Sequence, residues 1–229
     1  MLEDMGTMIA SLRAMLLPGR RPRDDKMAAM STTLLRILAQ RRPASLLSQE
    51  APRQEELEAV LRAAAGAKYD ERPTGWRAVV TTRPSAPLLA AAMAGLASVP
   101  NLTGPVPRLK GKKIRVLAAY RGSLSWASRG GAAIAIVFRH HPELEESKKV
   151  QRGEVSAARG VLEAAFYAQG WATIWSQREP YDREILRSFY DLDEHEEVLG
   201  WLFVGRAAPD SVPSRAINLP PRDLGISYI

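Results

Sequence analysis

The stretch that decides the fold runs from Ser156 to Trp175 and reads SAARGVLEAAFYAQGWATIW. Small and apolar residues recur in its first fourteen positions at the spacing of one wide buried helix face: Ala157, Val161, Leu162, Ala164, Ala165 and Ala168. Ser156 can cap the start of this helix, and Gly170 can adopt the left-handed conformation that ends it. Residues 171–175 then alternate as a strand does. The stretch predicts a central helix that leads into a core strand.

The alanines of this helix allow another helix to approach closely, which leucines would prevent. The approaching helix is either another helix of the same chain or the same helix of a second subunit. We therefore expect the segment at the centre of the fold, and a dimer interface is one interpretation of its small residues.

The same periodicities predict the elements on either side. Helices are expected over about 32–42, 54–67, 85–96 and 182–190, and strands over 76–82, 132–139 and 197–205. Residues 114–126 are ambiguous, and a short helix over the site is one interpretation. Strands separated by helices, with few hairpin signals, predict an α+β or mixed three-layer domain.

The two ends of the chain differ from this middle part in composition. Residues 1–29 contain the amphipathic run MIASLRAMLL, followed by the charged, helix-breaking run PGRRPRDD. They are either an N-terminal extension of the domain or a segment included because the first residue was assigned too far upstream. Residues 30–229 are expected to form the domain. Its proline-rich tail after residue 206 ends in the apolar ISYI, which suggests that it wraps over a neighbouring subunit.

Composition excludes several classes of function. The 229 residues include no cysteine, which excludes disulfides, thiolate nucleophiles and cysteine-ligated metals and favours a reducing cytoplasm. The longest apolar run, residues 86–97, is too short to cross a bilayer. The net charge of +7 comes from separate basic clusters without interleaved aromatic residues, so a solvated basic surface is favoured over nucleic-acid binding.

The common catalytic and nucleotide-binding motifs are missing from the sequence. It contains neither G-x-G-x-x-G nor a Walker A motif. His140 and His141 could ligate a metal with a nearby glutamate, but adjacent histidines at a strand end point in opposite directions, which favours a surface turn. His195 lies in an acidic turn, and no nucleophile elbow supports a Ser-His-Asp triad. No catalytic or metal-ligating residue is assigned.

Four segments nevertheless follow one another in a known order. The run Arg41-Arg42-Pro43-Ala44-Ser45 is similar to an Arg-Arg-Ser entry motif, and EELEAVLRAAAGA followed by Trp76 is similar to the next helix and strand start. The central AARGVLEAAFYAQGWATIW and the later DREILRSFYDLDEHEEVLGWLFVG are similar to a core helix and strand and to a closing helix and strand. Together they resemble the nitroreductase family of FMN-dependent NAD(P)H oxidoreductases, most closely its compact YdjA-like bacterial subgroup.

The resemblance implies a fold, a cofactor and partners. The implied fold is α+β, a nitroreductase-like three-layer α/β/α sandwich with a mixed, mainly antiparallel central sheet, in a domain-entwined homodimer. The cofactor is FMN, held at the subunit interface by both chains and reduced by NADH or NADPH. The implied activity is ping-pong hydride transfer to a small-molecule electron acceptor such as a nitroaromatic or a quinone, with no nucleic acid and no membrane as partner.

The family's cofactor contacts correspond to nine positions of this chain. Arg41 and Arg42 match cationic contacts to the phosphate and to the reduced flavin. The segment at the end of the central strand that lies against the flavin corresponds to Trp175, Ser176 and Gln177. The other positions come from the entry motif, the loop before the first strand and the tail: Pro43, Ser45, Asp70 and Arg215.

Three of these positions depart from the family's pattern. Pro43 replaces a serine and so removes a hydroxyl and a backbone donor. Asp70 brings a negative, acceptor-only group to a position that is normally neutral or positive, and Ser176 replaces the subgroup's arginine. Two hypotheses follow: an oxidoreductase in which Lys68, Arg72 or Arg178 replaces the lost contacts, or a flavin-free nitroreductase-fold homologue that acts as a binding or interaction protein.

Overall fold

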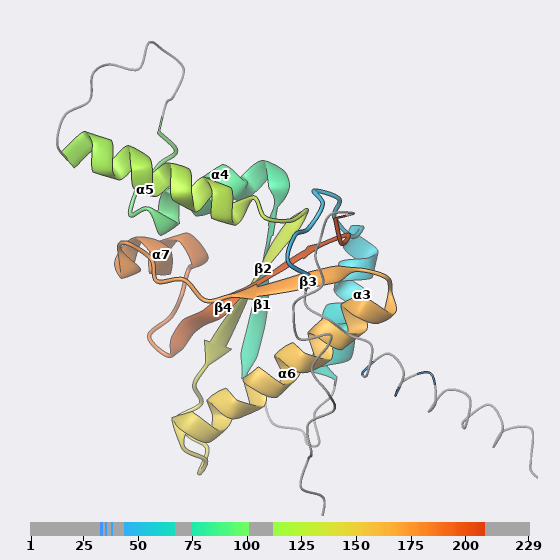
Figure 1. Cartoon of the computed structure of the whole chain (residues 1–229). Helices are drawn as coiled ribbons and strands as arrows, with labels where there is room; N and C mark the ends of the chain where they lie inside the picture. The colour runs from blue at the N-terminus through green and yellow to red at the C-terminus, as the bar shows by residue number, and fades with distance from the viewer. Residues whose placement is uncertain are drawn as a thin grey trace, which may run out of the picture. The chain divides into compact units, whose positions relative to one another are not determined.

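The computed structural model describes residues 33, 35, 38, 44–66, 75–100 and 112–208 (Figure 1). The chain divides into two units, Met1–Gln40 and Arg41–Ile229, and the account below concerns the second. In the first unit the three described residues are helical, in agreement with the predicted helix at 32–42. Two of these residues, Leu35 and Leu38, are exposed.

Within the described residues, four strands form the central sheet. They are β1 (Trp76–Thr82), β2 (Ala132–Arg139), β3 (Ala172–Ser176) and β4 (Glu196–Gly205). Their order in the sheet is β1-β2-β4-β3, and each neighbouring pair is antiparallel. The buried middle strand β2 consists of the continuous apolar run AAIAIVF followed by Arg139, as the sequence predicted.

Five α-helices and one 3₁₀ turn connect the described strands. They are α3 (Gln54–Ala65), the turn Arg83–Ser85, α4 (Ala86–Met93), α5 (Lys112–Ala127), α6 (Lys148–Ala168) and α7 (Arg183–Tyr190). The ambiguous stretch 114–126 is therefore helical throughout. Asp182 caps α7 by accepting hydrogen bonds from the backbone of the next turn, whereas Ser85 precedes α4 without a side-chain cap bond.

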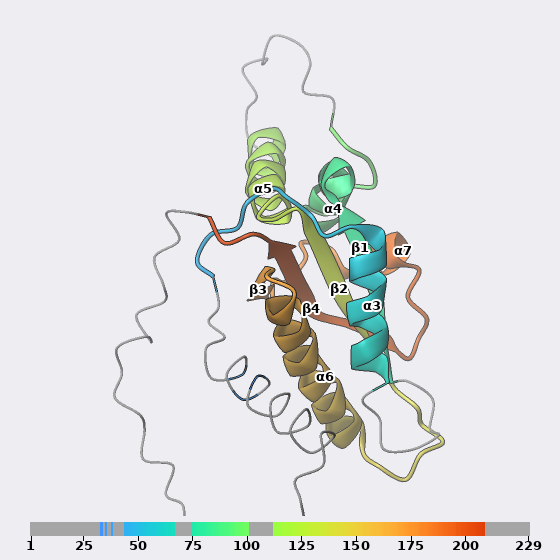
Figure 2. The ribbon, with the colours of Figure 1, turned by 90° about the vertical axis from the view of Figure 1, so that its right-hand side faces the viewer.

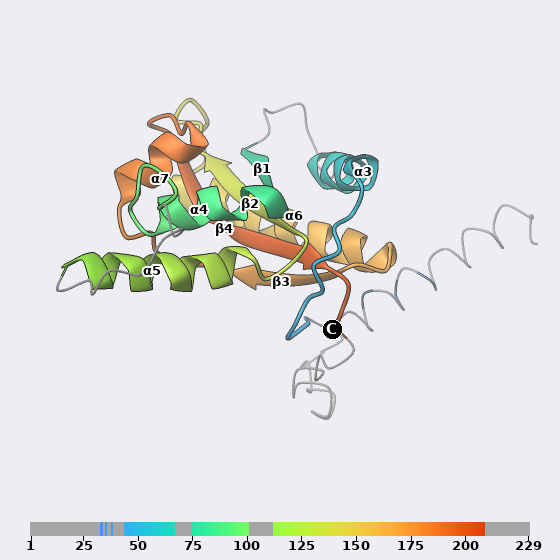
Figure 3. The same cartoon turned by 90° about the horizontal axis from the view of Figure 1, so that it is seen from above.

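Helices cover both faces of the sheet, which gives the three layers predicted from the sequence (Figures 2 and 3). Alternate residues of a strand point to opposite faces. On β2, Ala133 and Ala135 belong to the core with α4, α5 and α7, while Ile134 and Ile136 belong to the core with α3 and α6. Small residues on the first face leave room for the Trp126 ring, which packs edge-on against Trp201 and Phe203.

The decisive stretch forms the second half of α6 and all but the last residue of β3. Gly170 has a φ of 77°, so it ends the helix in the left-handed region as predicted. The predicted helix start at Ser156 is wrong, because α6 begins at Lys148 behind the cap residue Ser147. Ser156 lies inside the helix and donates its hydroxyl to the Arg152 carbonyl at 3.1 Å.

The buried face of α6 also differs from the expected one. Leu162 is fully buried as predicted, together with Val155 and Phe166. Three residues that were predicted to be buried are exposed in the single chain: Ala157, Val161 and Ala168. The small residues of α6 thus lie largely outside the core, on a face left open to solvent in the single chain. Over the described residues, no helix is long and apolar enough to span a membrane.

Candidate functional site

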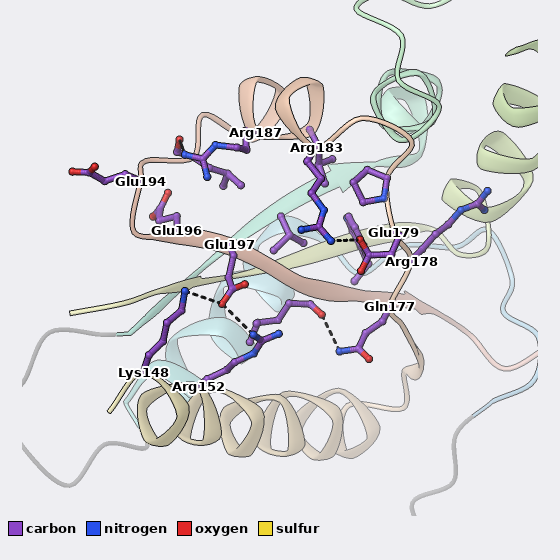
Figure 4. A pocket seen from close by; sticks show the side chains of 16 residues that line it. Lys148, Arg152, Gln177, Arg178, Glu179, Arg183, Arg187, Glu194, Glu196 and Glu197 are labelled. Carbon is purple, nitrogen blue, oxygen red and sulfur yellow. Dashed lines mark hydrogen bonds and ion pairs between the residues drawn. The ribbon is translucent and has the colours of Figure 1, made fainter. Parts of the chain in front are cut away.

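The candidate site begins where β3 ends. Strand β3 pairs with β4 from Ala172 opposite Gly205 to Ser176 opposite Trp201, and the first residues of β4 extend beyond this pairing. Gln177 follows the last paired residue, and its side-chain Nε2 donates to the Leu199 carbonyl at 3.2 Å. A cavity of about 610 Å³ lies beside this part of β4, between α6 and α7 (Figure 4).

Trp175 lies directly against the backbone of β4. The β2–β4 register shifts between Ile136 and Val137, which places a bulge next to Gly200. A Cβ at Gly200, whose φ is 156°, would lie 2.6 Å from Cζ2 of Trp175, so only glycine permits this contact. The Arg159 guanidinium lies 4.9 Å from the centre of the same indole ring. The orientation of Trp175 therefore depends on both neighbours.

Ser176 connects the strand end to α5. Its hydroxyl oxygen accepts a hydrogen bond from Nε1 of the buried Trp126 at 2.9 Å. A hydroxyl that accepts one bond still has a proton to donate. This serine therefore fixes the position of α5 against β3 and keeps one donor.

Arg178 brings a positive charge to the same place. It is half-buried, donates from Nη1 to the Gly122 carbonyl at 3.2 Å and lies 5.5 Å from the ring centre of Trp126. Burial lowers the pKa of its guanidinium, and the nearby charge of Arg129 lowers it further. Within the described part of the chain, no carboxylate lies within ion-pair distance of Arg178. As far as the described residues go, the end of β3 thus carries a positive charge without a carboxylate partner.

The charges that line the cavity are mostly paired. Glu197 forms an ion pair with Lys148 at 3.5 Å and accepts a hydrogen bond from Arg152 at 3.2 Å (Figure 4). Arg183 pairs with Glu179 at 3.0 Å. These pairs lie on opposite walls, so the cavity presents a mixed polar surface.

Glu196 lines the cavity and has a structural role. Its side chain is 1% exposed and accepts from Arg77 and Arg139. Hydrogen bonds from Arg77, as the largest effect, hold the pKa of this carboxyl below its usual value. Since the ionised form is favoured, Glu196 is a poor proton donor near neutral pH.

The structure brings together only some of the predicted site residues. Trp175, Ser176 and Gln177 lie in sequence at the end of β3. Ser45 lies elsewhere, because its neighbours Leu46 and Leu47 pair with residues 207 and 208, next to the start of β3. The remaining predicted positions lie outside the described residues: Arg41, Arg42, Pro43, Asp70 and Arg215.

Trp126 and Arg129 are two residues of the site that sequence reasoning missed. They come from α5 and the turn after it, about fifty residues before β3. A signal for this region is present in the sequence, because residues 72–142 contain eleven lysines and arginines and no aspartate or glutamate. A basic stretch of this kind indicates a surface that favours anions.

Neither a protein-family model nor a curated protein matches the chain. Solved structures do match. The chain is similar to a nitroreductase-like family protein from Bacillus cereus, with a TM-score of 0.62 and 14% identity over 86% of this chain and 95% of that one. The chain has the nitroreductase fold. The nitroreductase fold that the sequence resemblance implied is thereby confirmed, while the subgroup and the homodimer stay predictions.

Two further solved structures with this fold are nitroreductases whose names mention FMN. One is a nitroreductase with bound FMN from Bacteroides fragilis, with a TM-score of 0.59 and 14% identity over 86% of this chain and 98% of that one. The other is an FMN-dependent nitroreductase from Clostridium difficile, with a TM-score of 0.54 and 15% identity over 84% and 98%.

Proposed function

We propose that the protein is an FMN-dependent NAD(P)H oxidoreductase of the nitroreductase type. The observation that carries this proposal is Arg178, which has no carboxylate partner among the described residues and directly follows the segment Trp175–Gln177, in a chain that shares its fold with an FMN-bound nitroreductase. That segment is the one which the sequence resemblance assigns to the flavin.

The described residues fit the charge of this cofactor. FMN carries a phosphate, and its ring system gains negative charge on reduction, so its site needs cations. Arg178 and Arg129 supply positive charge at the end of β3, and the Ser176 hydroxyl keeps one donor. Arg41, Arg42 and Arg215 are expected to hold the phosphate.

The reaction follows from what bound FMN supplies, which is two-electron hydride chemistry. NAD(P)H, one proton and a nitroaromatic would give NAD(P)⁺, a nitroso compound and water; with a quinone the product is the quinol. The contribution of the chain is to orient the ring by backbone and indole contacts, and to place positive charge where negative charge develops. A cytoplasmic location is expected for such an enzyme.

We also propose that the protein acts as a homodimer. The exposed face of α6 contains Gly153 and Gly160, and a Cβ at either position would meet nothing within 4 Å. Glycine inside a helix costs about 1 kcal/mol relative to alanine, so the described residues give no reason for either glycine. Close approach of a second copy would give one. Because Ser45 and Ser176 lie towards opposite ends of β3, a site that uses both would also need two chains.

One observation supports the alternative, a flavin-free homologue that acts as a binding or interaction protein. The Ser176 hydroxyl accepts from Trp126, and the Gln177 amide donates to Leu199. Both side chains therefore already have partners within the chain. Pro43 and Asp70, which depart from the family's pattern, agree with this alternative.

The visible absorption spectrum of the desalted protein, before and after addition of excess FMN, distinguishes the two functions. The oxidoreductase should keep flavin bands through desalting, and these bands should bleach when NADH or NADPH is added without air. A colourless dimer that does not take up FMN would contradict the enzyme and support the alternative.

A variant tests the phosphate contacts. Arg41→Ala should weaken FMN binding at least tenfold, as expected for loss of a charge-assisted hydrogen bond. The control is Arg62→Ala, which removes an exposed arginine of α3 that pairs with Glu58. Equal losses of FMN affinity and thermal stability in Arg41→Ala would indicate that the residue only supports the fold.

A further inference from the structure

The cations around α5 are distributed differently from those elsewhere in the chain. Residues 72–142 carry no carboxylate side chain, although the whole chain has 25 aspartates and glutamates. Other helices pair their arginines within a turn, as Arg62 with Glu58 on α3 and Arg183 with Glu179 before α7. Within the described residues, Arg115, Arg121 and Arg129 are exposed and lie outside such pairs. The surface of α5 is therefore strongly positive.

Three arginines, Arg115, Arg178 and Arg129, form a row along this surface. Arg115 and Gly122 are seven residues apart on α5, which brings them to nearly the same side of the helix about 10 Å apart, and Arg129 follows in the turn after the last helical residue, Ala127. Gly122 has no side chain, and the Arg178 guanidinium lies at this position, bonded to the Gly122 carbonyl. Arg178 thus occupies the middle of the row, between Arg115 and Arg129.

Packing does not explain Gly122. A Cβ added there would meet only Nη2 of Arg178, at 3.8 Å, which is an ordinary van der Waals contact. Alanine is favoured over glycine inside a helix, so the fold alone would favour alanine. What glycine provides is an uncovered edge of the Arg178 guanidinium, because a larger side chain would lie over it.

Arg178 is held firmly enough to act as a binding group. Its guanidinium packs on the Trp126 ring, and the Trp126 indole is itself bonded to Ser176. An arginine fixed in this way loses little side-chain entropy on binding, and its planar fork suits a carboxylate or a phosphate. The nearby Arg129 charge repels it, and a bound anion would relieve this repulsion.

We propose that Arg178 and Arg129 bind the anionic group of the electron acceptor, so that the enzyme prefers aromatic acceptors which carry a carboxylate or a phosphate. This inference rests on the proposed function, because it places the acceptor beside the segment Trp175–Gln177. The redox step is unchanged: NAD(P)H supplies two electrons, and the anionic group takes no part in bond making. A nucleic acid is less well matched, since no exposed aromatic residue accompanies the row of arginines in the described part of α5.

Steady-state kinetics with two acceptors of similar size test the proposal. The ratio of kcat/KM for 4-nitrobenzoate to kcat/KM for the neutral 4-nitrobenzyl alcohol should be well above one in the wild type and should fall with added salt. Arg178→Ala should lower this ratio about tenfold or more, and Arg178→Lys by less. Gly122→Leu, which covers the guanidinium, should also lower it. Gly122→Ala and the distant Arg62→Ala should leave the ratio unchanged.

Several results would overturn the proposal. An unchanged ratio in Arg178→Ala would do so. So would a loss of affinity for FMN but not for riboflavin in Arg178→Ala, because that result assigns the arginine to the cofactor phosphate. Binding of an oligonucleotide that depends on Arg178, without acceptor selectivity, would assign the row to nucleic acid instead.

Failure of the proposed function would be recognised separately, as a wild-type protein that takes up no FMN. Calorimetric titration of the flavin-free protein with 4-nitrobenzoate then decides the inference. Binding that is lost in Arg178→Ala but kept in Arg62→Ala supports an anion site for small aromatic acids. Absence of binding overturns it.

Discussion

Arg77 and Glu196 form a two-pronged ion pair across the sheet, with Nε to Oε1 and Nη2 to Oε2 both at 2.9 Å. The same arginine donates to the Tyr190 carbonyl at 2.9 Å, and Arg139 donates to Oε1 of the glutamate at 2.9 Å. One carboxylate thereby joins β1, β2 and β4, while Arg77 ties them to the end of α7. Because the Glu196 side chain is 1% exposed, this charge depends on its partners.

Removal of Arg77 should therefore destabilise the fold. Arg77→Ala leaves a buried carboxylate with Arg139 as its remaining arginine partner, and we expect a loss of about 3 kcal/mol in the free energy of unfolding. Arg62→Ala, which breaks an exposed pair on α3, should cost less than about 0.5 kcal/mol. Urea unfolding followed by circular dichroism measures both. Similar losses in the two variants would contradict a special role for the buried pair.

The same pair should make stability depend on pH in the acid range. The pKa of Glu196 is lowered in the folded state, chiefly by hydrogen bonds from Arg77. Its contribution is therefore fully present above the unfolded glutamate pKa of about 4.3 and is lost as pH falls through the lower folded value. The Glu196→Gln variant should lack this pH-dependent contribution to the free energy of unfolding. The two unfolding free energies should converge as the pH falls below about 4.3; a constant difference would contradict the linkage.

Tyr190 should produce the opposite dependence at alkaline pH. Burial raises the pKa of its hydroxyl to about 12, and the hydroxyl accepts from Nε1 of Trp201 at 2.8 Å. A raised pKa favours the protonated folded state, so this stability is present below about pH 10 and is lost as pH rises towards 12. Absorbance titration of the folded protein at 295 nm should show the same number of tyrosines ionising near pH 10 in the wild type and in Tyr190→Phe. One fewer in the variant would show that Tyr190 ionises normally.

Much of the fold could be predicted because its elements are encoded locally. The strand 132–139 is one apolar run, and Asp182 stands at the position of a cap for α7. The first two turns of α6 could not be predicted, because the residues KKVQRGE show no apolar period. They depend on Gln151, a buried polar residue whose amide donates to the carbonyls of His141 and Glu146 and accepts from the His141 backbone. Such a contact leaves no pattern in a hydrophobicity profile.

The candidate site was predicted only where it is continuous in sequence. Trp175, Ser176 and Gln177 follow a recognisable helix, glycine and strand. The partners that orient them, Trp126 and Gly200, are distant in sequence and are brought close by strand pairing and by the bulge in β4. No local pattern indicates that an indole should lie against one particular glycine.

Gly153 and Gly160 of α6 give a test of the proposed dimer. Gly160→Leu should separate the subunits while it leaves the helix content of the chain unchanged, because a Cβ at this position meets no described residue within 4 Å. Light scattering coupled to size-exclusion chromatography measures the mass. The control is Glu55→Ala, an exposed residue in the first turn of α3. A dimer that persists in Gly160→Leu would place the interface elsewhere, and a monomeric wild type would contradict the dimer itself.

The contact between Gly200 and Trp175 links the fold to the proposed flavin segment. Gly200→Ala would place a methyl group 2.6 Å from Cζ2 of Trp175 and 2.9 Å from the Ser176 carbonyl oxygen, so the indole and the strand end must move. We expect a loss of about 2 kcal/mol in stability, as for other overpacked sites, and weaker FMN binding because Ser176 and Gln177 move with the strand. Gly122→Ala is the control: its added methyl group would meet only Nη2 of Arg178, at 3.8 Å, and should stabilise α5 by up to about 1 kcal/mol without loss of FMN binding. Thermal unfolding and FMN titration of both variants measure the two effects. If Gly200→Ala loses stability but binds FMN as the wild type does, the end of β3 is not part of the flavin site.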